Sequence, residues 1–145
     1  MSSALRNWLE SDQALRRHAP DTEQKIQELE SEIGSRVPEP LRQLLLISGS
    51  QEGFLGESYI AFFNASEIAA CWHQAQQMAD GFVPFASNGA GEWYGFDSRS
   101  QPCTFVLLPA IGAEWDDALP LGATWDDFLG VLKSGTLFER KDTPS

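Results

Sequence analysis

Carboxylates dominate the side chains of this sequence that could carry out chemistry, and two adjacent pairs stand out, Asp116-Asp117 and Asp126-Asp127. Paired carboxylates act as general acid and general base when both converge on one substrate. Neighbouring side chains, however, diverge by about 100° on a helix and by nearly 180° on a strand. Asp126 and Asp127 also fit the first turn of a helix, where negative charge offsets the helix dipole. The spacing therefore does not predict a carboxylate catalytic centre.

The glycine-rich stretch Val83–Ser100, "VPFASNGAGEWYGFDSRS", raises the question of a phosphate-binding loop. Such a loop needs either GxxxxGKS or GxxxxGKT, whose lysine reaches the phosphates, or GxGxxG at the start of a helix. Gly89, Gly91 and Gly95 have neither spacing, no lysine follows the run, and the downstream sequence resembles a strand. Asn88-Gly89 instead favours a tight turn with positive φ, which Gly91 can extend as a bulge. We therefore predict a hairpin, in which Gly95 marks a bulge or the close approach of another segment.

The thiol and imidazole side chains are too dispersed to predict a metal site or a thiol enzyme. Cys71 and His73 lie two positions apart, and on a helix they would point about 200° away from each other. Cys103 and His73 are a conceivable nucleophile and base, but nothing in their spacing favours the pair. With two cysteines and no CxxC motif, neither a disulfide framework nor a thiolate zinc site is expected. We predict no metal, no other cofactor and no catalytic residue.

The net charge of −11 is informative because of where positive charge is missing. Between Arg42 and Lys133 the sequence contains a single Lys or Arg, which is Arg99. Proteins that bind nucleic acids need several such cations to neutralise phosphates, so we do not expect a nucleic-acid partner. An acidic surface favours encounter with basic proteins, although acidity is also a common route to solubility.

Neither end of the sequence nor its interior indicates a membrane protein. No apolar segment reaches the 18 residues that a bilayer-spanning helix needs. The first residues, "MSSALRNWLESDQALRRH", lack the basic start and the apolar run of a signal peptide. We expect a cytoplasmic protein with no membrane partner.

Tryptophans beside carboxylates and turns are the best candidates for a protein-binding surface. Trp115 lies among carboxylates in "GAEWDDALP", which suits an acidic rim around an aromatic anchor. Trp93 has a similar setting, and we expect both indoles to be exposed. The alternative, a solvated loop with Trp115 packed into the core, remains open. The predicted partner-binding residues are Glu92, Trp93, Asp97, Glu114, Trp115, Asp116 and Asp117.

The order of predicted elements indicates a single α+β domain with a largely antiparallel sheet flanked by helices. Apolar spacing predicts helices over residues 3–17 and 21–33, a short helix after "SRVPEP" that ends near Ser48 and Gly49, a helix after "SYIAFFNA", and a last helix in "TWDDFLGVLKSG". The β-branched and aromatic runs "SYIAFFNA", "FVPFAS", "EWYGFD" and "TFVLLPAI" predict strands. We expect an N-terminal helix within residues 1–20, a domain over residues 21–138 and a flexible tail over residues 139–145.

Three helix starts carry the spacing of a capping box, in which a side chain accepts a backbone N–H bond that the helix leaves unpaired. The pairs are Asp21 and Gln24, Asn64 and Glu67, and Thr124 and Asp127. Gly34 is a suitable C-terminal stop for the helix that begins at residue 21.

These segments together resemble the SUKH superfamily, the Smi/Knr-like domains. The resemblance lies in the order "IQELESEIGSRVPEPLRQLLLISG", "YIAFFNASEIA", "VPFASNGAGEWYGFD" and "LGATWDDFLGVL", and it covers about residues 22–133. One departure is Ser48, where the family commonly has Asn before the glycine. The opening signature is met by Ile26, Glu30, Gly34, Val37, Pro38, Leu41, Leu44 and Gly49.

The resemblance implies an α+β fold without an established catalytic centre, and it provides no catalytic residues to carry over. Bacterial members are mostly inferred to be immunity proteins that bind and neutralise a toxin domain, whereas fungal members regulate cell-wall synthesis. We therefore expect an immunity protein that neutralises a cognate polymorphic toxin, with a basic toxin domain as its partner. The alternatives are a regulatory adaptor of a housekeeping protein, and an enzyme or small-ligand binder that uses the hairpin region.

Overall fold

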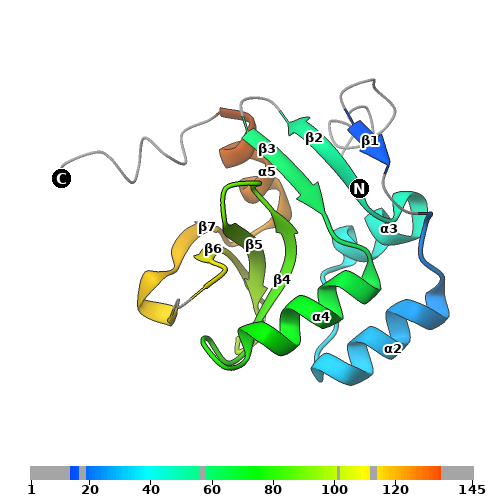
Figure 1. Cartoon of the computed structure of the whole chain (residues 1–145), viewed down its shortest axis with the longest axis horizontal. Helices are drawn as coiled ribbons and strands as arrows, with labels where there is room; N and C mark the ends of the chain where they lie inside the picture. The colour runs from blue at the N-terminus through cyan, green and yellow to red at the C-terminus, as the bar shows by residue number, and fades with distance from the viewer. Residues whose placement is uncertain (1–13, 17–18, 56–57, 101, 112–113, 135–145) are drawn as a thin grey trace.

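The computed structural model places seven antiparallel strands in one sheet, and their order in the sheet follows their order in the chain (Figure 1). It describes residues 14–16, 19–55, 58–100, 102–111 and 114–134. The strands are β1 (Ala14–Arg16), β2 (Gln51–Leu55), β3 (Ser58–Phe62), β4 (Phe82–Ser87), β5 (Glu92–Asp97), β6 (Thr104–Pro109) and β7 (Leu119–Gly122). The helices are α2 (Glu23–Ile33), α3 (Glu39–Ser48), α4 (Ala65–Ala75), α5 (Trp125–Ser134) and the short 3₁₀ turn η1 (Trp115–Asp117). The predicted α+β class with an antiparallel sheet is confirmed.

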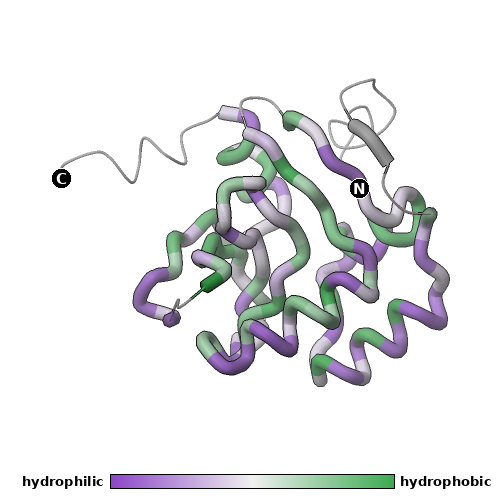
Figure 2. Tube along the Cα trace, viewed as in Figure 1, coloured by the Kyte–Doolittle hydropathy of each residue, from purple (hydrophilic) through white to green (hydrophobic). Residues whose placement is uncertain are grey.

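Helices α2 and α4 lie side by side on one flank of the sheet, whereas α5 packs on the central strands through aromatic rings (Figure 1). The ring of Phe85 in β4 lies 5.6 Å from Trp125 and 5.5 Å from Phe128, measured between centroids. Full burial of one such side chain contributes roughly 1.5–3 kcal/mol. Figure 2 shows that polar and apolar residues alternate along α2.

The first predicted helix is corrected where the structure describes it. Residues 14–16 form strand β1, which pairs antiparallel with β2, and Ala14 lies opposite Gly53. Hydrogen bonds to a neighbouring strand outweigh the local helical spacing of Leu15, because sheet pairing depends on tertiary context that a periodicity argument omits. Residues 1–13 and 17 of that prediction lie outside the described part of the chain.

Two of the three predicted helix caps are found at the expected residues. At the start of α4, Asn64 Oδ1 accepts from the Glu67 N–H at 2.9 Å, and Glu67 Oε1 accepts from the Asn64 N–H at 3.0 Å. At the start of α5, Thr124 Oγ1 accepts from the Asp127 N–H at 3.1 Å. Gly34 ends α2 in the left-handed conformation, with φ of 72°.

The predicted cap of α2 is wrong, because Thr22 takes the role that the sequence assigned to Asp21. Thr22 Oγ1 accepts from the Lys25 N–H at 3.2 Å. Asp21 is buried, and its Oδ2 accepts from the N–H of Ala65, the first residue of α4, at 2.8 Å. The Asp21 N–H donates to Leu45 O in α3 at 2.8 Å. This one residue therefore ties three helices together.

The predicted hairpin joins β4 to β5, and its glycines serve backbone geometry. Gly89 and Gly91 have φ of 75° and 85°, a conformation that favours glycine. Asn88 Oδ1 closes the turn by accepting from the N–H groups of Ala90 at 2.9 Å and Glu92 at 3.2 Å.

Gly95, inside β5, marks the close approach that the sequence predicted. A Cβ atom added there would lie 2.5 Å from both the Phe82 ring and the Val83 carbonyl oxygen. The adjacent register of β4 against β5 shifts between Pro84 and Ala86, so the irregularity lies in the neighbouring strand. Only a residue without a side chain fits this contact.

Candidate functional site

The structure brings Asp97 and Trp115 together at one end of β5 through Arg99. Asp97 Oδ1 accepts from the Arg99 backbone N–H and from Nε, both at 3.0 Å, and Oδ2 accepts from Nη2 at 2.9 Å. The guanidinium carbon of Arg99 lies 3.7 Å from the ring centroid of Trp115. The cation therefore forms a two-point bond with a carboxylate and is stacked on an indole at the same time.

Trp115 is fixed to the loop that leads into β4. Its Nε1–H donates to Asp80 O at 2.8 Å, and its ring meets the Phe82 ring edge-on at 6.0 Å. The indole is half-buried and packs against the core, so it lies between the expected exposed residue and the alternative of a core residue. One face of an anchored aromatic ring is thus available to a cation.

The loop beneath Arg99 is itself held in place. The Gly81 N–H donates to Gln76 Oε1 at 2.8 Å, and Gly81 O accepts from Ser98 N at 2.9 Å and Ser98 Oγ at 2.7 Å. Gly81 has φ of 92°, and a Cβ atom there would lie 2.6 Å from Arg99 Cγ. The arginine stem therefore lies directly on the glycine, on a surface that three hydrogen bonds keep rigid.

The charges of this end of the sheet are mostly negative. Burial raises the pKa of Asp97, but the hydrogen bonds and positive charge of Arg99 outweigh burial and leave that pKa lowered. Hydrogen bonding to Asp97 and the charges of Asp97 and Asp80 outweigh burial and raise the pKa of Arg99. Asp80, which acts on Arg99, is exposed, and so are Glu114, Asp116 and Asp117, the chain neighbours of Trp115. We define the acidic end as Asp80, Asp97, Arg99 and residues 114–117.

The predicted residues Glu92 and Trp93 lie at the opposite end of β5. Trp93 is 9% exposed and belongs to the core, so its expected exposure is wrong. Glu92 is half-buried and its Oε1 accepts from Asn88 Nδ2 at 3.0 Å within the hairpin. Because a strand rises about 3.3 Å per residue, roughly 16 Å separate Glu92 from Asp97 and roughly 13 Å separate Trp93 from Asp97. The seven predicted residues therefore form two groups.

Sequence reasoning missed Arg99 and Asp80 as members of the acidic end, and it missed Gly81 as the residue on which the Arg99 stem lies. Arg99 did carry a signal, because it is the single cation in ninety residues of sequence and follows Asp97 by two positions. The sequence carries no signal for Asp80 or Gly81. Asp80 contacts Trp115 and Gly81 contacts Ser98, and both contacts exist only in the fold.

The thiols and imidazole show no catalytic arrangement in the described residues. Burial raises the pKa of Cys71 and of Cys103, which disfavours the reactive thiolate of each. His73 Nε2 lies 3.0 Å from Glu32 Oε1 and thus faces α2. Across the same residues, no three His, Cys, Asp or Glu side chains gather to hold a metal ion.

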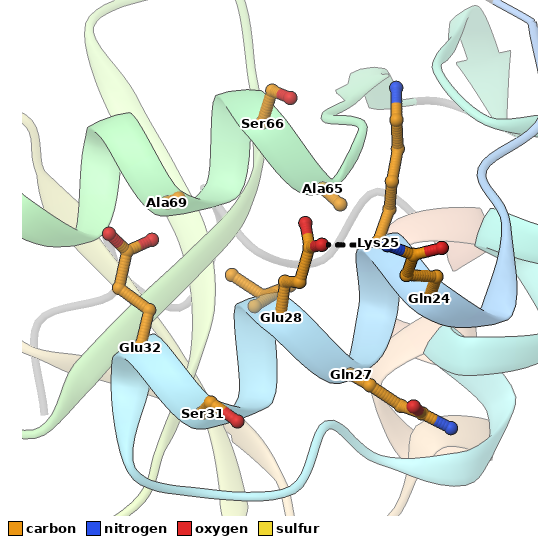
Figure 3. A pocket seen from close by; sticks show the side chains of 10 residues that line it. Gln24, Lys25, Gln27, Glu28, Ser31, Glu32, Ala65, Ser66 and Ala69 are labelled. Atoms are coloured by element: carbon orange, nitrogen blue, oxygen red, sulfur yellow. Dashed lines mark hydrogen bonds between the residues drawn. The ribbon is translucent and has the colours of Figure 1, made fainter.

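A groove of about 690 Å³ runs between α2 and α4 (Figure 3). On the α2 side, Glu28 Oε1 accepts from Gln24 Nε2 at 3.2 Å, and Glu32 pairs with His73. The α4 side consists of small side chains, those of Ala65, Ser66 and Ala69. None of the predicted partner-binding residues lines this groove, and these two carboxylates are already bonded to neighbours.

Comparison with known proteins gives a family for most of the chain. The sequence model of the SMI1 / KNR4 family (SUKH-1) matches residues 20–130. No curated protein matches the sequence. Among the described residues, no helix combines the length and the apolar character needed to cross a bilayer.

Proposed function

The chain belongs to the SMI1 / KNR4 family (SUKH-1), and we propose that it is a non-catalytic immunity protein that neutralises a cognate toxin domain of basic charge. It acts in the cytoplasm by binding the toxin over its active site or an adjacent surface. This role is the one that the family resemblance implies for a bacterial member, and it requires no chemistry from the immunity protein itself.

The observation that carries the proposal is the composition of the acidic end. Three segments far apart in the sequence contribute carboxylates to it: Asp80 before β4, Asp97 at the end of β5, and residues 114–117. These segments carry five carboxylates and one cation, and that cation, Arg99, is already paired with Asp97. A basic surface is the complementary partner.

The physical properties of the acidic end suit rapid and specific protein binding. A surface whose charges are mostly of one sign attracts a partner of the opposite charge and raises the association rate. Fast association favours capture of a toxin before it acts. Tryptophan and arginine are enriched among the residues that dominate interface energies. Trp115 is also held by a hydrogen bond to Asp80 O, so little side-chain freedom is lost when a partner covers it.

Co-expression with the toxin domain encoded next to this gene tests the proposal. The wild-type protein should restore growth and co-purify with the toxin. Asp116→Lys, which reverses one exposed charge in the acidic end, should weaken both effects. Glu28→Lys makes the same change of charge on the exposed face of α2 and should leave both intact.

Two results would contradict the proposal in different ways. Unchanged toxicity with no co-purification would exclude immunity against that toxin and would favour the adaptor alternative. Protection that survives Asp116→Lys but is lost with Glu28→Lys would move the binding surface from the acidic end to the groove between α2 and α4.

A further inference from the structure

We propose that Trp115 and Asp97 form a recognition site for an arginine side chain of the partner, and that Arg99 occupies this site in the free protein. The inference rests on the proposed function for the identity of the partner, a basic protein. Recognition of a guanidinium group by this site does not depend on which protein supplies it.

The site has the geometry that a guanidinium group requires. Asp97 accepts through both of its oxygens from two different nitrogens of the Arg99 side chain, and the same group lies 3.7 Å above the indole centroid. A planar group with donors in a fixed fork satisfies both contacts at once, whereas a lysine ammonium is a point charge that does not. The ligand class is therefore arginine.

The receptor half of this arrangement is more buried than the ligand half. Trp115 is bonded to Asp80 O, and the Asp97 side chain is 15% exposed. Arg99 follows the end of β5, its side chain is 51% exposed, and its stem lies on Gly81 without a Cβ atom beneath it. An incoming arginine can make the same two-point bond and ring contact that Arg99 gives up, so the exchange conserves these interactions.

Charge favours a partner's arginine over the protein's own. The Asp80 carboxylate acts on Arg99 at the site, and the exposed carboxylates of Glu114, Asp116 and Asp117 flank Trp115 in the chain, so Arg99 compensates only one of these negative charges. A partner that supplies one arginine to Trp115 and further cations to the rim satisfies more of these carboxylates. Arg99 then turns outward, where its exposed position leaves it in solvent.

Intramolecular occupancy sets the size of the expected effect. If Arg99 covers the site about 90% of the time, the apparent affinity for an external guanidinium is roughly tenfold weaker than that of the vacant site. Removing the Arg99 guanidinium should therefore strengthen the binding of a free arginine derivative by roughly that factor.

The experiment is a titration of Arg99→Gln and of the wild-type protein with N-acetyl-arginine methylamide. The Trp115 indole N–H resonance, identified with Trp115→Phe, is the readout because this group lies at the site. We expect a saturable shift in Arg99→Gln, with an affinity about tenfold above that of the wild type. The neutral isostere N-acetyl-citrulline methylamide should produce no saturable shift, and Arg99→Gln combined with Asp97→Asn should abolish the response to arginine.

The titration involves no toxin, so it fails independently of the proposed function. Equal responses to the arginine and citrulline probes, or an Arg99→Gln affinity no higher than that of the wild type, would overturn the inference and leave Arg99 as a link between two loops. If Arg99→Gln does not fold, Arg99→Ala gives the same comparison. Failure of both variants to fold would likewise show that Arg99 is a structural link and would overturn the inference.

Discussion

The two ends of strand β5 each have a carboxylate near an indole, but the surroundings of these groups differ. At the hairpin end, Glu92 and Trp93 follow the Asn88 turn, and at the acidic end Asp97 is joined to Trp115 by Arg99. Both ends therefore combine a carboxylate with an indole. At the hairpin end the polar groups bond to the turn and the indole is buried, whereas at the acidic end the indole holds a cation near the surface.

The burial of an aromatic residue beside a carboxylate therefore depends on its position relative to the sheet. Trp93 lies within a central strand, between its partners Ser87 in β4 and Leu108 in β6, so both sides of its backbone are covered. Trp115 lies in the short turn η1 outside the sheet. We therefore expect substitutions at the hairpin end to change stability and those at the acidic end to change binding.

The largest expected effect separates the two tryptophans. Trp93→Ala should lower the free energy of unfolding by about 3–5 kcal/mol, since it leaves a cavity in the core. Trp115→Ala should lower it by about 1–2 kcal/mol, because a half-buried ring and one hydrogen bond are lost. Urea unfolding of the two variants measures both values. A larger loss for Trp115→Ala than for Trp93→Ala would contradict the view that the hairpin end is the more structural of the two.

A smaller effect is expected from the turn itself. Asn88→Ala should cost about 1–3 kcal/mol, because the side chain accepts from two backbone N–H groups and donates to Glu92. The matched change at the acidic end is Arg99→Gln, which should cost at most about 1 kcal/mol, as exposed ion pairs do. Thermal and urea unfolding give the two numbers, and equal costs would mean that the acidic end is as structural as the hairpin.

The smallest expected effect is the pH dependence of the Asp97 and Arg99 pair. The folded-state pKa of Asp97 lies below its ordinary value of 3.8, so the unfolded chain takes up the proton first as the pH falls. The stabilisation is therefore complete above roughly pH 5 and is lost as the pH falls through 3.8 toward the folded-state pKa. The difference in unfolding free energy between wild type and Asp97→Asn should shrink over this range. A difference that stays constant down to about pH 3 would show that Arg99 does not hold Asp97 ionised.

Local patterns predicted much of the fold because they act over a few residues. The Asn88-Gly89 turn, the cap formed by Asn64 and Glu67, and the left-handed stop at Gly34 all depend on neighbours within four positions. The family resemblance over residues 22–133 was confirmed by the match over residues 20–130.

The remaining features depend on contacts between distant parts of the chain. Asp21 bonds to Ala65, forty-four positions away, so its local capping spacing was misleading. β1 forms by pairing with β2, and this pairing cannot be predicted from local periodicity. Asp97 and Trp115 were both named as candidates from the sequence, but Arg99, which contacts each of them, links them only in the fold.

The most direct test of the account follows the five tryptophan indole N–H resonances while the toxin domain encoded beside this gene is added. We predict that the shift of the Trp115 resonance is complete at one equivalent of toxin, and that the Trp93 resonance at the hairpin end does not shift. A stable complex in which Trp115 is unchanged would contradict the assignment of the acidic end as the binding surface.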